Sequence, residues 1–310
     1  MISDKQNAAR QLHCLGAQRQ LYATAKVIFG WQIVLGCPIA VISAILVISD
    51  PSLKGFAASW GILVTLADIF WLTPWQKRLR ESAARIQEEF DCDVLELPWN
   101  ELKAGKHPDP ELVKEQSDKY AAWAAKMPPI TNWYAPSVDE LPLHIGRIAC
   151  QRSNCWWDAN QRRRYAAWVI GIVASIFAVV LGLSLVTGMT IEDFVLKVVA
   201  PLAPALTIGI RQYLEQTDAA ERLDKLKAHS ESLWKEALSG TTAKNLTAKS
   251  RNLQDEIFEN RKKSPPVFDF IFMRLRPKYE QQMNFGTEEL VEQAREKLKI
   301  PKKALENPLS

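Results

Sequence analysis

Asp68 is an acidic residue inside a long apolar run of the sequence, Gly55–Thr73. It precedes Pro74 by six residues, so on a helix it lies about 9 Å inside the end of that run. A carboxylate in hydrocarbon is costly unless it faces water, a cationic partner or the interior of a helix bundle. Three interpretations are therefore open: a pore-lining or gate-forming group, an interfacial residue paired with Arg or Trp that serves only packing, and a proton-coupling residue of a transporter.

Guanidinium and indole side chains gather in the stretch before the third apolar run. Guanidinium forks match the geometry of phosphates, and indole faces stack on bases. This stretch is a candidate site for an anionic nucleotide, with structural packing as the alternative. Its residues are Arg147, Arg152, Asn154, Trp156 and Trp157.

Other basic residues stand directly beside the apolar runs. Lysine and arginine at the end of a membrane span can contact lipid phosphates at the interface. Nucleotide binding is the alternative for the three consecutive arginines among them. We expect lipid-headgroup contacts from Lys77, Arg78, Arg162, Arg163 and Arg164.

The sequence carries no signature of catalysis: no Gly-rich phosphate loop, no G-x-S-x-G, no H-E-x-x-H and no kinase motif set. Cys150 and Cys155, taken with His144 and Cys92, match no common zinc spacing. We therefore predict no catalytic residue, no metal and no cofactor. The net charge of +4 is too small to indicate a DNA or RNA polymer as partner.

Four apolar runs, grouped as two pairs, would position these residues. A run of about 18 or more apolar residues can cross a bilayer as a helix, and the first three runs meet that length. The fourth has a clean stretch of only 13 residues, Val198–Ile210, which a core helix or a re-entrant segment could also explain. Pro201 and Pro204 predict a kink there, in either a packing helix or a pore-lining helix. The runs are Val27–Ile48, Gly55–Thr73, Ala166–Thr187 and Val195–Ile210.

The loops within each pair are short, so each pair should form an antiparallel hairpin. Basic residues flank the runs on the side opposite these loops, which places both termini and the segment 74–165 in the cytoplasm. The predicted fold class is an all-α membrane protein, with four transmembrane helices in two hairpins and a mainly helical cytosolic domain. The predicted parts are a cytosolic N-terminal helix 1–26, hairpin 27–73, cytosolic part 74–165, hairpin 166–210 and cytosolic part 211–310.

Local patterns refine the cytosolic parts. Apolar spacing predicts helices over Gln76–Phe90, Pro110–Ala125, Leu143–Arg164, Gln212–Leu238 and Thr247–Arg261. Asp91–Leu97 alternates polar and apolar residues, which predicts a short strand or an extended segment. Pro265–Leu275 is an apolar island bounded by Pro277; it should pack in the core, with the membrane surface as the alternative. A short helix and a disordered end are expected over 286–310.

Several strings of residues resemble the bacterial S-4TM family, whose members are expected to be pore-forming effectors. The likeness covers most of residues 15–235, and no functional residue is carried over from the family. It implies a role in antiviral defence, in which a cyclic nucleotide made by a partner enzyme triggers membrane disruption. The strings are Ala17–Tyr22, Trp60–Thr65, Trp71–Leu79, Phe90–Asn100, Lys106–Glu111, Glu140–His144 and Asn154–Asp158.

These observations lead to one hypothesis and two rivals. The hypothesis is a homo-oligomeric effector in the bacterial inner membrane that binds a cyclic oligonucleotide and opens a pore or breaches the bilayer. The first rival is a scaffold or sensor whose spans only tether a cytosolic interaction domain. The second is a small transporter, which the scarcity of polar residues in the apolar runs disfavours.

Overall fold

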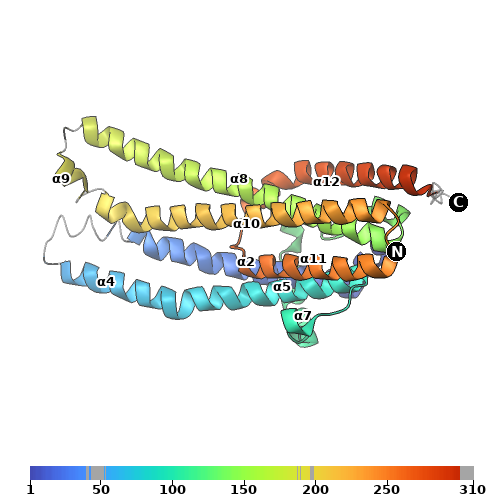
Figure 1. Ribbon diagram of the computed structural model, residues 1–310. Coiled ribbons are helices and arrows are strands. Elements are labelled where there is room, and N and C mark those ends of the chain that lie inside the picture. Colours follow the sequence, from blue (N-terminus) through green and yellow to red (C-terminus); the bar gives the residue numbers. More distant parts are fainter. Residues whose placement is uncertain are drawn as a thin grey trace.

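The computed structural model describes residues 1–39, 42, 52, 54–186, 188, 190–195 and 199–300. Every regular element in this part of the chain is a helix, and the long helices lie side by side along one axis (Figure 1). The elements are α1 (Ile2–Gln6), α2 (Ala9–Gly36), α4 (Lys54–Ala67), η2 (Asp68–Leu72), α5 (Thr73–Leu95), α6 (Glu101–Ala104), α7 (Pro110–Ala121), η3 (Ala124–Lys126), η4 (Pro136–Glu140), α8 (Leu143–Val186), α9 (Ile191–Phe194), α10 (Ala200–Leu238), α11 (Ala243–Lys263) and α12 (Asp269–Leu298).

The molecule has two ends of different character. We call the described residues of 1–26, 74–165 and 211–300 the polar body, and those of 27–73 and 166–210 the apolar end. Helices α11 and α12 lie only along the polar body, whereas α9 lies at the far tip of the apolar end (Figure 1). The N-terminus and the end of α12 lie at the opposite tip, within the polar body.

The core of the polar body brings together five long helices. Burial of large apolar side chains removes them from water and is the main stabilising contribution to such a core. Most of the fully buried members come from α2, α5, α8, α10 and α11, so no single hairpin forms the core alone. They include Leu15, Ile86, Phe90, Ile148, Leu233 and Leu253.

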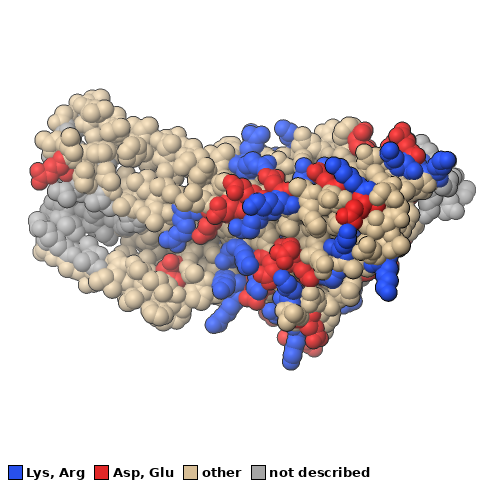
Figure 2. All heavy atoms as spheres, viewed as in Figure 1, with Lys and Arg blue, Asp and Glu red and all other residues tan. Residues whose placement is uncertain are grey.

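The apolar end exposes its hydrophobic side chains. The most apolar 18-residue stretch of α8 is only 6% buried, and among the described residues α8 is the one helix long and apolar enough to cross a membrane. On the face drawn in Figure 2, charged side chains crowd the polar body and are sparse on the apolar end. The four-span arrangement stays a prediction, because parts of the first, third and fourth runs lie outside the described residues.

Helices α8 and α10 pack against each other from the polar body into the apolar end. They approach closely at Gly209, where an added Cβ would lie 2.5 Å from Cγ2 of Val173. Only glycine permits this contact, which is the small-residue packing typical of helices in membranes.

The predicted strand over Asp91–Leu97 is wrong. Helix α5 continues to Leu95 and ends at Glu96, whose φ of 51° is left-handed. The alternation of polar and apolar residues arises because this part of the helix is buried on its polar face as well as its apolar face: Asp91 is as completely buried as Val94. The polar residues of this segment therefore do not mark a solvated strand face.

Most of the predicted helices are confirmed, with changes at their ends. The helix from Leu143 runs without a break into the third apolar run, as expected, whereas α7 already ends at Ala121. Pro277 does not end a segment, because it lies inside the long helix α12. The apolar island 265–275 is buried only in part: Val267 and Ile271 pack against Tyr165, whereas Phe270 and Met273 are exposed.

A buried ionic network fastens α11 to α5. Nη2 of Arg251 lies 2.5 Å from Oε1 of Glu88, and Nη1 of Arg261 lies 2.5 Å from Oδ2 of Asp91. Nε2 of Gln254 donates hydrogen bonds of 2.9 Å to both carboxylates. Burial of these charges is tolerable because each carboxylate meets a guanidinium and an amide donor.

Replacing Arg251 with alanine tests this network, because it leaves Glu88 buried without its cation. Removing one partner of a buried ion pair costs about 3–5 kcal/mol. A large domain loses about 2–4 °C of melting temperature per kcal/mol, so we expect a fall of roughly 10 °C for the detergent-solubilised protein.

Lys103→Ala is the matched control. Lys103 pairs with Glu256 of α11 at 3.4 Å on the surface, and exposed pairs contribute only about 0–1 kcal/mol. Similar melting temperatures for the two variants would contradict the role assigned to Arg251.

Candidate functional site

Asp68 begins η2, a single π-helical segment between α4 and α5. Its Oδ1 accepts hydrogen bonds from Nε2 of Gln32 at 2.6 Å and from Oγ1 of Thr73 at 3.2 Å. Nε2 of Gln76 donates to Oε1 of Gln32 at 3.1 Å. These four residues form the Asp68 cluster, which joins α2 to the α4–η2–α5 rod through neutral partners. Single π-turns within α-helices are frequent at functional sites.

The other predicted gate residues lie on α10. Pro201 and Pro204 fall within the first five residues of that helix. Backbone N–H groups in the first turn have no partner within a helix, so a proline at the second position removes no helical hydrogen bond. Pro204, at the fifth position, does remove a helical donor, and residues 196–198 lie outside the described part of the chain, so the kink in this run stays a prediction.

The predicted headgroup-contacting residues separate into two groups. Lys77, Arg78 and Arg164 are exposed near the junction of the polar body and the apolar end, and Arg163 is exposed but paired with Asp224. Arg162 lies instead in the interior, where Nη1 donates to the backbone O of Pro265 at 2.9 Å. Consecutive helical residues point about 100° apart, which is why a run of three arginines cannot share one face.

The five residues predicted to bind a nucleotide do not form one site. Arg147 is buried and donates to Oγ1 of Thr247 at 2.7 Å, and Arg152 pairs with Glu231 at 3.1 Å. Trp156 packs edge-on against Tyr279 at 5.7 Å between ring centroids. Asn154 and Trp157 differ from these three, because both line a cavity in the polar body.

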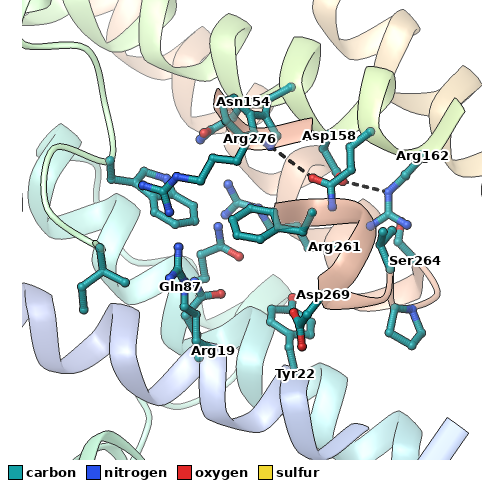
Figure 3. A pocket seen from close by; sticks show the side chains of 18 of the residues that line it. Arg19, Tyr22, Gln87, Asn154, Asp158, Arg162, Arg261, Ser264, Asp269 and Arg276 are labelled. Atoms are coloured by element: carbon teal, nitrogen blue, oxygen red, sulfur yellow. Dashed lines mark hydrogen bonds and ion pairs between the residues drawn. The ribbon is translucent and has the colours of Figure 1, made fainter. Parts of the chain in front are cut away.

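This cavity, of about 240 Å³, lies between α2, α5, α8, α10, α11, α12 and the segments before α8 and α12 (Figure 3). Aromatic side chains make up much of its wall. They are Tyr22, Trp123, Trp133, Trp157 and Phe272. Burial raises the pKa of Tyr22 to about 12, so its hydroxyl stays protonated at neutral pH.

Charged side chains of both signs line the cavity, and nearly all of them are paired. The pairs are Lys26 with Asp269 at 2.5 Å, Arg162 with Asp158 at 3.0 Å, Arg276 with Glu280 at 3.1 Å and Arg261 with Asp91 at 2.5 Å.

Arg19 differs from the other cations of the cavity. Its Nη1 donates to the backbone O of Pro128 at 2.9 Å and to the hydroxyl of Tyr120 at 3.4 Å, and its guanidinium lies 5.4 Å from the ring centroid of Phe272. No carboxylate of the described residues forms an ion pair with it. Burial lowers the pKa of Arg19, because the charged form loses hydration that an anion would replace.

Ser264, which is 2% exposed, carries a buried hydroxyl that has no hydrogen-bond partner in the described part of the chain. The side chains of Gln18 and Gln87 are 3% and 8% exposed and form no hydrogen bond with other described residues. Buried polar groups are nearly always satisfied, by protein, water or ligand. The cavity thus offers unused donors and acceptors beside an unpaired cation.

The cavity was not predicted from the sequence, although one signal for it exists. Gln18, Arg19 and Tyr22 all lie in the string Ala17–Tyr22, immediately before the first apolar run. Polar residues that recur at i and i+4 lie on one face of a helix, and if that face is buried they need hydrogen-bonding or charged partners within the protein.

Residues 1–290 match the model of the SMODS-associating 4TM effector domain. A probable CBASS effector molecule of Bacillus cereus (strain VD146) is 22% identical over 286 residues, which cover 90% of this chain and 95% of the relative. No solved structure matches the chain. Because the match to the family model spans nearly the whole sequence, the chain belongs to the SMODS-associating 4TM effector family.

Proposed function

We propose that this protein is the membrane effector of a bacterial antiphage system, which a cyclic nucleotide triggers and which disrupts the inner membrane as a homo-oligomer. Family membership and the relative described as a probable CBASS effector support the antiphage role. The membrane part of the proposal depends on the apolar end of the structure.

The exposed apolar surface of α8 is the observation that carries the proposal. A soluble monomer rarely exposes a large continuous apolar patch, yet the most apolar stretch of α8 is only 6% buried. A bilayer would cover this surface without cost, since lipid chains are as apolar as the side chains that face them.

The exposed basic residues support an orientation with the polar body in the cytoplasm. Lys77, Arg78 and Arg164 stand where the polar body meets the apolar end. Lysine and arginine near span ends favour the cytoplasmic side. In this orientation the tip with α9 faces outward, and both termini stay with the polar body.

Pore formation would require several copies, because the apolar end of one chain presents a few helices that pack on one another. The Asp68 cluster supplies a carboxylate about 9 Å inside the end of the second apolar run, hydrogen-bonded to an amide and a hydroxyl. An assembly that turned this cluster toward a shared axis would give ions a polar path through hydrocarbon.

The rival function is a scaffold that the apolar end only tethers. We expect inducible expression of the wild-type protein in bacteria, together with its signalling enzyme, to dissipate the membrane potential and stop growth. A potential-sensitive dye measures the first effect and culture density the second. Full polarisation at high expression of both proteins would favour the scaffold and refute the effector.

Substitutions of Asp68 test the cluster. Asp68→Leu removes the acceptor for Gln32 and Thr73, so we expect depolarisation to be lost at wild-type expression levels. Asp68→Asn keeps an Oδ1 acceptor but removes the charge, so an intermediate depolarisation is expected. Each is measured with the same dye.

Asp109→Leu is the matched control, because Asp109 is exposed on the polar body and caps no backbone group. It should depolarise as the wild type does. Wild-type depolarisation by Asp68→Leu would exclude the cluster from the membrane activity.

A further inference from the structure

We propose that the cavity beside Arg19 binds one nucleotide unit of a cyclic oligonucleotide, with its phosphate on Arg19 and Arg276 and its base against the aromatic wall. The identity of the ligand rests on the proposed function, whereas the location of the site rests on the contacts within the polar body.

The phosphate position follows from two guanidinium groups that share one ring. Arg19 from α2 and Arg276 from α12 approach the same side of the cavity (Figure 3). Their guanidinium carbons lie 5.4 and 5.8 Å from the ring centroid of Phe272. Among the described residues, Glu280 supplies the one carboxylate that forms an ion pair with either of them. The two positive charges exceed the negative charge beside them, and guanidinium forks suit phosphate oxygens.

The base position follows from the unpaired polar groups and the aromatic side chains. Gln18 and Gln87 each carry an amide donor and acceptor, which is the pattern that reads the edge of a base. Ser264 adds a hydroxyl that has no partner. Trp133 and Trp157 supply ring faces and edges of the kind on which bases stack in nucleic-acid sites.

Size and charge restrict the ligand. A cavity of 240 Å³ is below the range of about 300–1,000 Å³ that encloses a whole drug-sized molecule. It suits one unit of a larger ring, with the remaining units outside. Asp158, Asp269 and Glu280 would repel a triphosphate, whereas a phosphodiester carries a single charge per unit.

The place of the cavity in the fold connects a ligand to the membrane part. Its walls include residues of α2 and α8, and these two helices continue past the cavity into the apolar end. Lys26, which lines the cavity, directly precedes the first apolar run. A ligand that draws Arg19 and Arg276 together would therefore act on α2 before it enters the membrane.

The test measures ligand binding by the purified full-length protein in detergent. Calorimetry and quenching of tryptophan fluorescence are the two readouts. The probes are cyclic dinucleotides and trinucleotides of adenosine and guanosine, with ATP and inorganic phosphate as comparisons. We expect one cyclic oligonucleotide to bind, and ATP and phosphate to bind at least tenfold more weakly.

Two variants locate the site. Arg19→Ala should weaken binding at least tenfold, and Arg10→Ala is its control, because Arg10 lies on the same helix but pairs with Glu89 and Asp93 on the surface. Ser264→Ala should weaken binding about threefold or more. It removes a hydroxyl that makes no hydrogen bond, so its melting temperature should stay at the wild-type value.

The outcomes separate this inference from the proposed function. Wild-type affinity in both Arg19→Ala and Ser264→Ala would overturn the assigned site and leave the nucleotide-triggered effector standing. A wild-type protein that binds no cyclic oligonucleotide, yet depolarises cells, would overturn the inference and the nucleotide trigger but not the membrane activity. Competition by phosphatidylglycerol that abolishes nucleotide binding would assign the cavity to a lipid headgroup and likewise overturn it.

Discussion

The packing of the polar body depends on two carboxylates that α5 carries into its interior, those of Glu88 and Asp91. Ionised groups in an apolar interior are stable only when cations and hydrogen-bond donors surround them. Arg251 and Arg261 of α11 meet this requirement, which determines where α11 lies against α5. Arg261 also lines the cavity, so the ionic network that holds α11 against α5 also fixes the position of one wall of the candidate ligand site.

The same network anchors the segment before α8. The hydroxyl of Tyr134 donates to Oδ1 of Asp91 at 2.5 Å and accepts from Nδ2 of Asn154 at 3.0 Å. The backbone of Tyr134 exchanges two hydrogen bonds with the side chain of Gln6, at 2.7 and 3.1 Å. The neighbouring Trp133 therefore stands in the cavity wall on a backbone that α1, α5 and α8 hold together.

Helices were predictable from the sequence where local pattern and burial agree, as in Leu143–Arg164, whose continuation into the apolar run is confirmed. The prediction failed at Asp91–Leu97, because buried carboxylates produce the alternation of a half-exposed strand. The ligand site was only partly predictable. Of the five residues selected on α8, Asn154 and Trp157 reach the cavity, since spacing along one helix does not reveal which face meets α2 and α12. Likewise, Arg162 points inward although its neighbours are exposed.

The unbroken course of α8 has a mechanical consequence. Its 44 residues make a rod about 66 Å long, which begins in the core, passes the cavity and ends near the end of the third apolar run. Among its residues, Leu143–Val186, there is no proline to serve as a hinge. A tilt of one degree about the core end would move the far end by about 1 Å over that length. A small adjustment of side chains around a ligand would therefore become a larger displacement of the far end of α8 against lipid chains and neighbouring subunits.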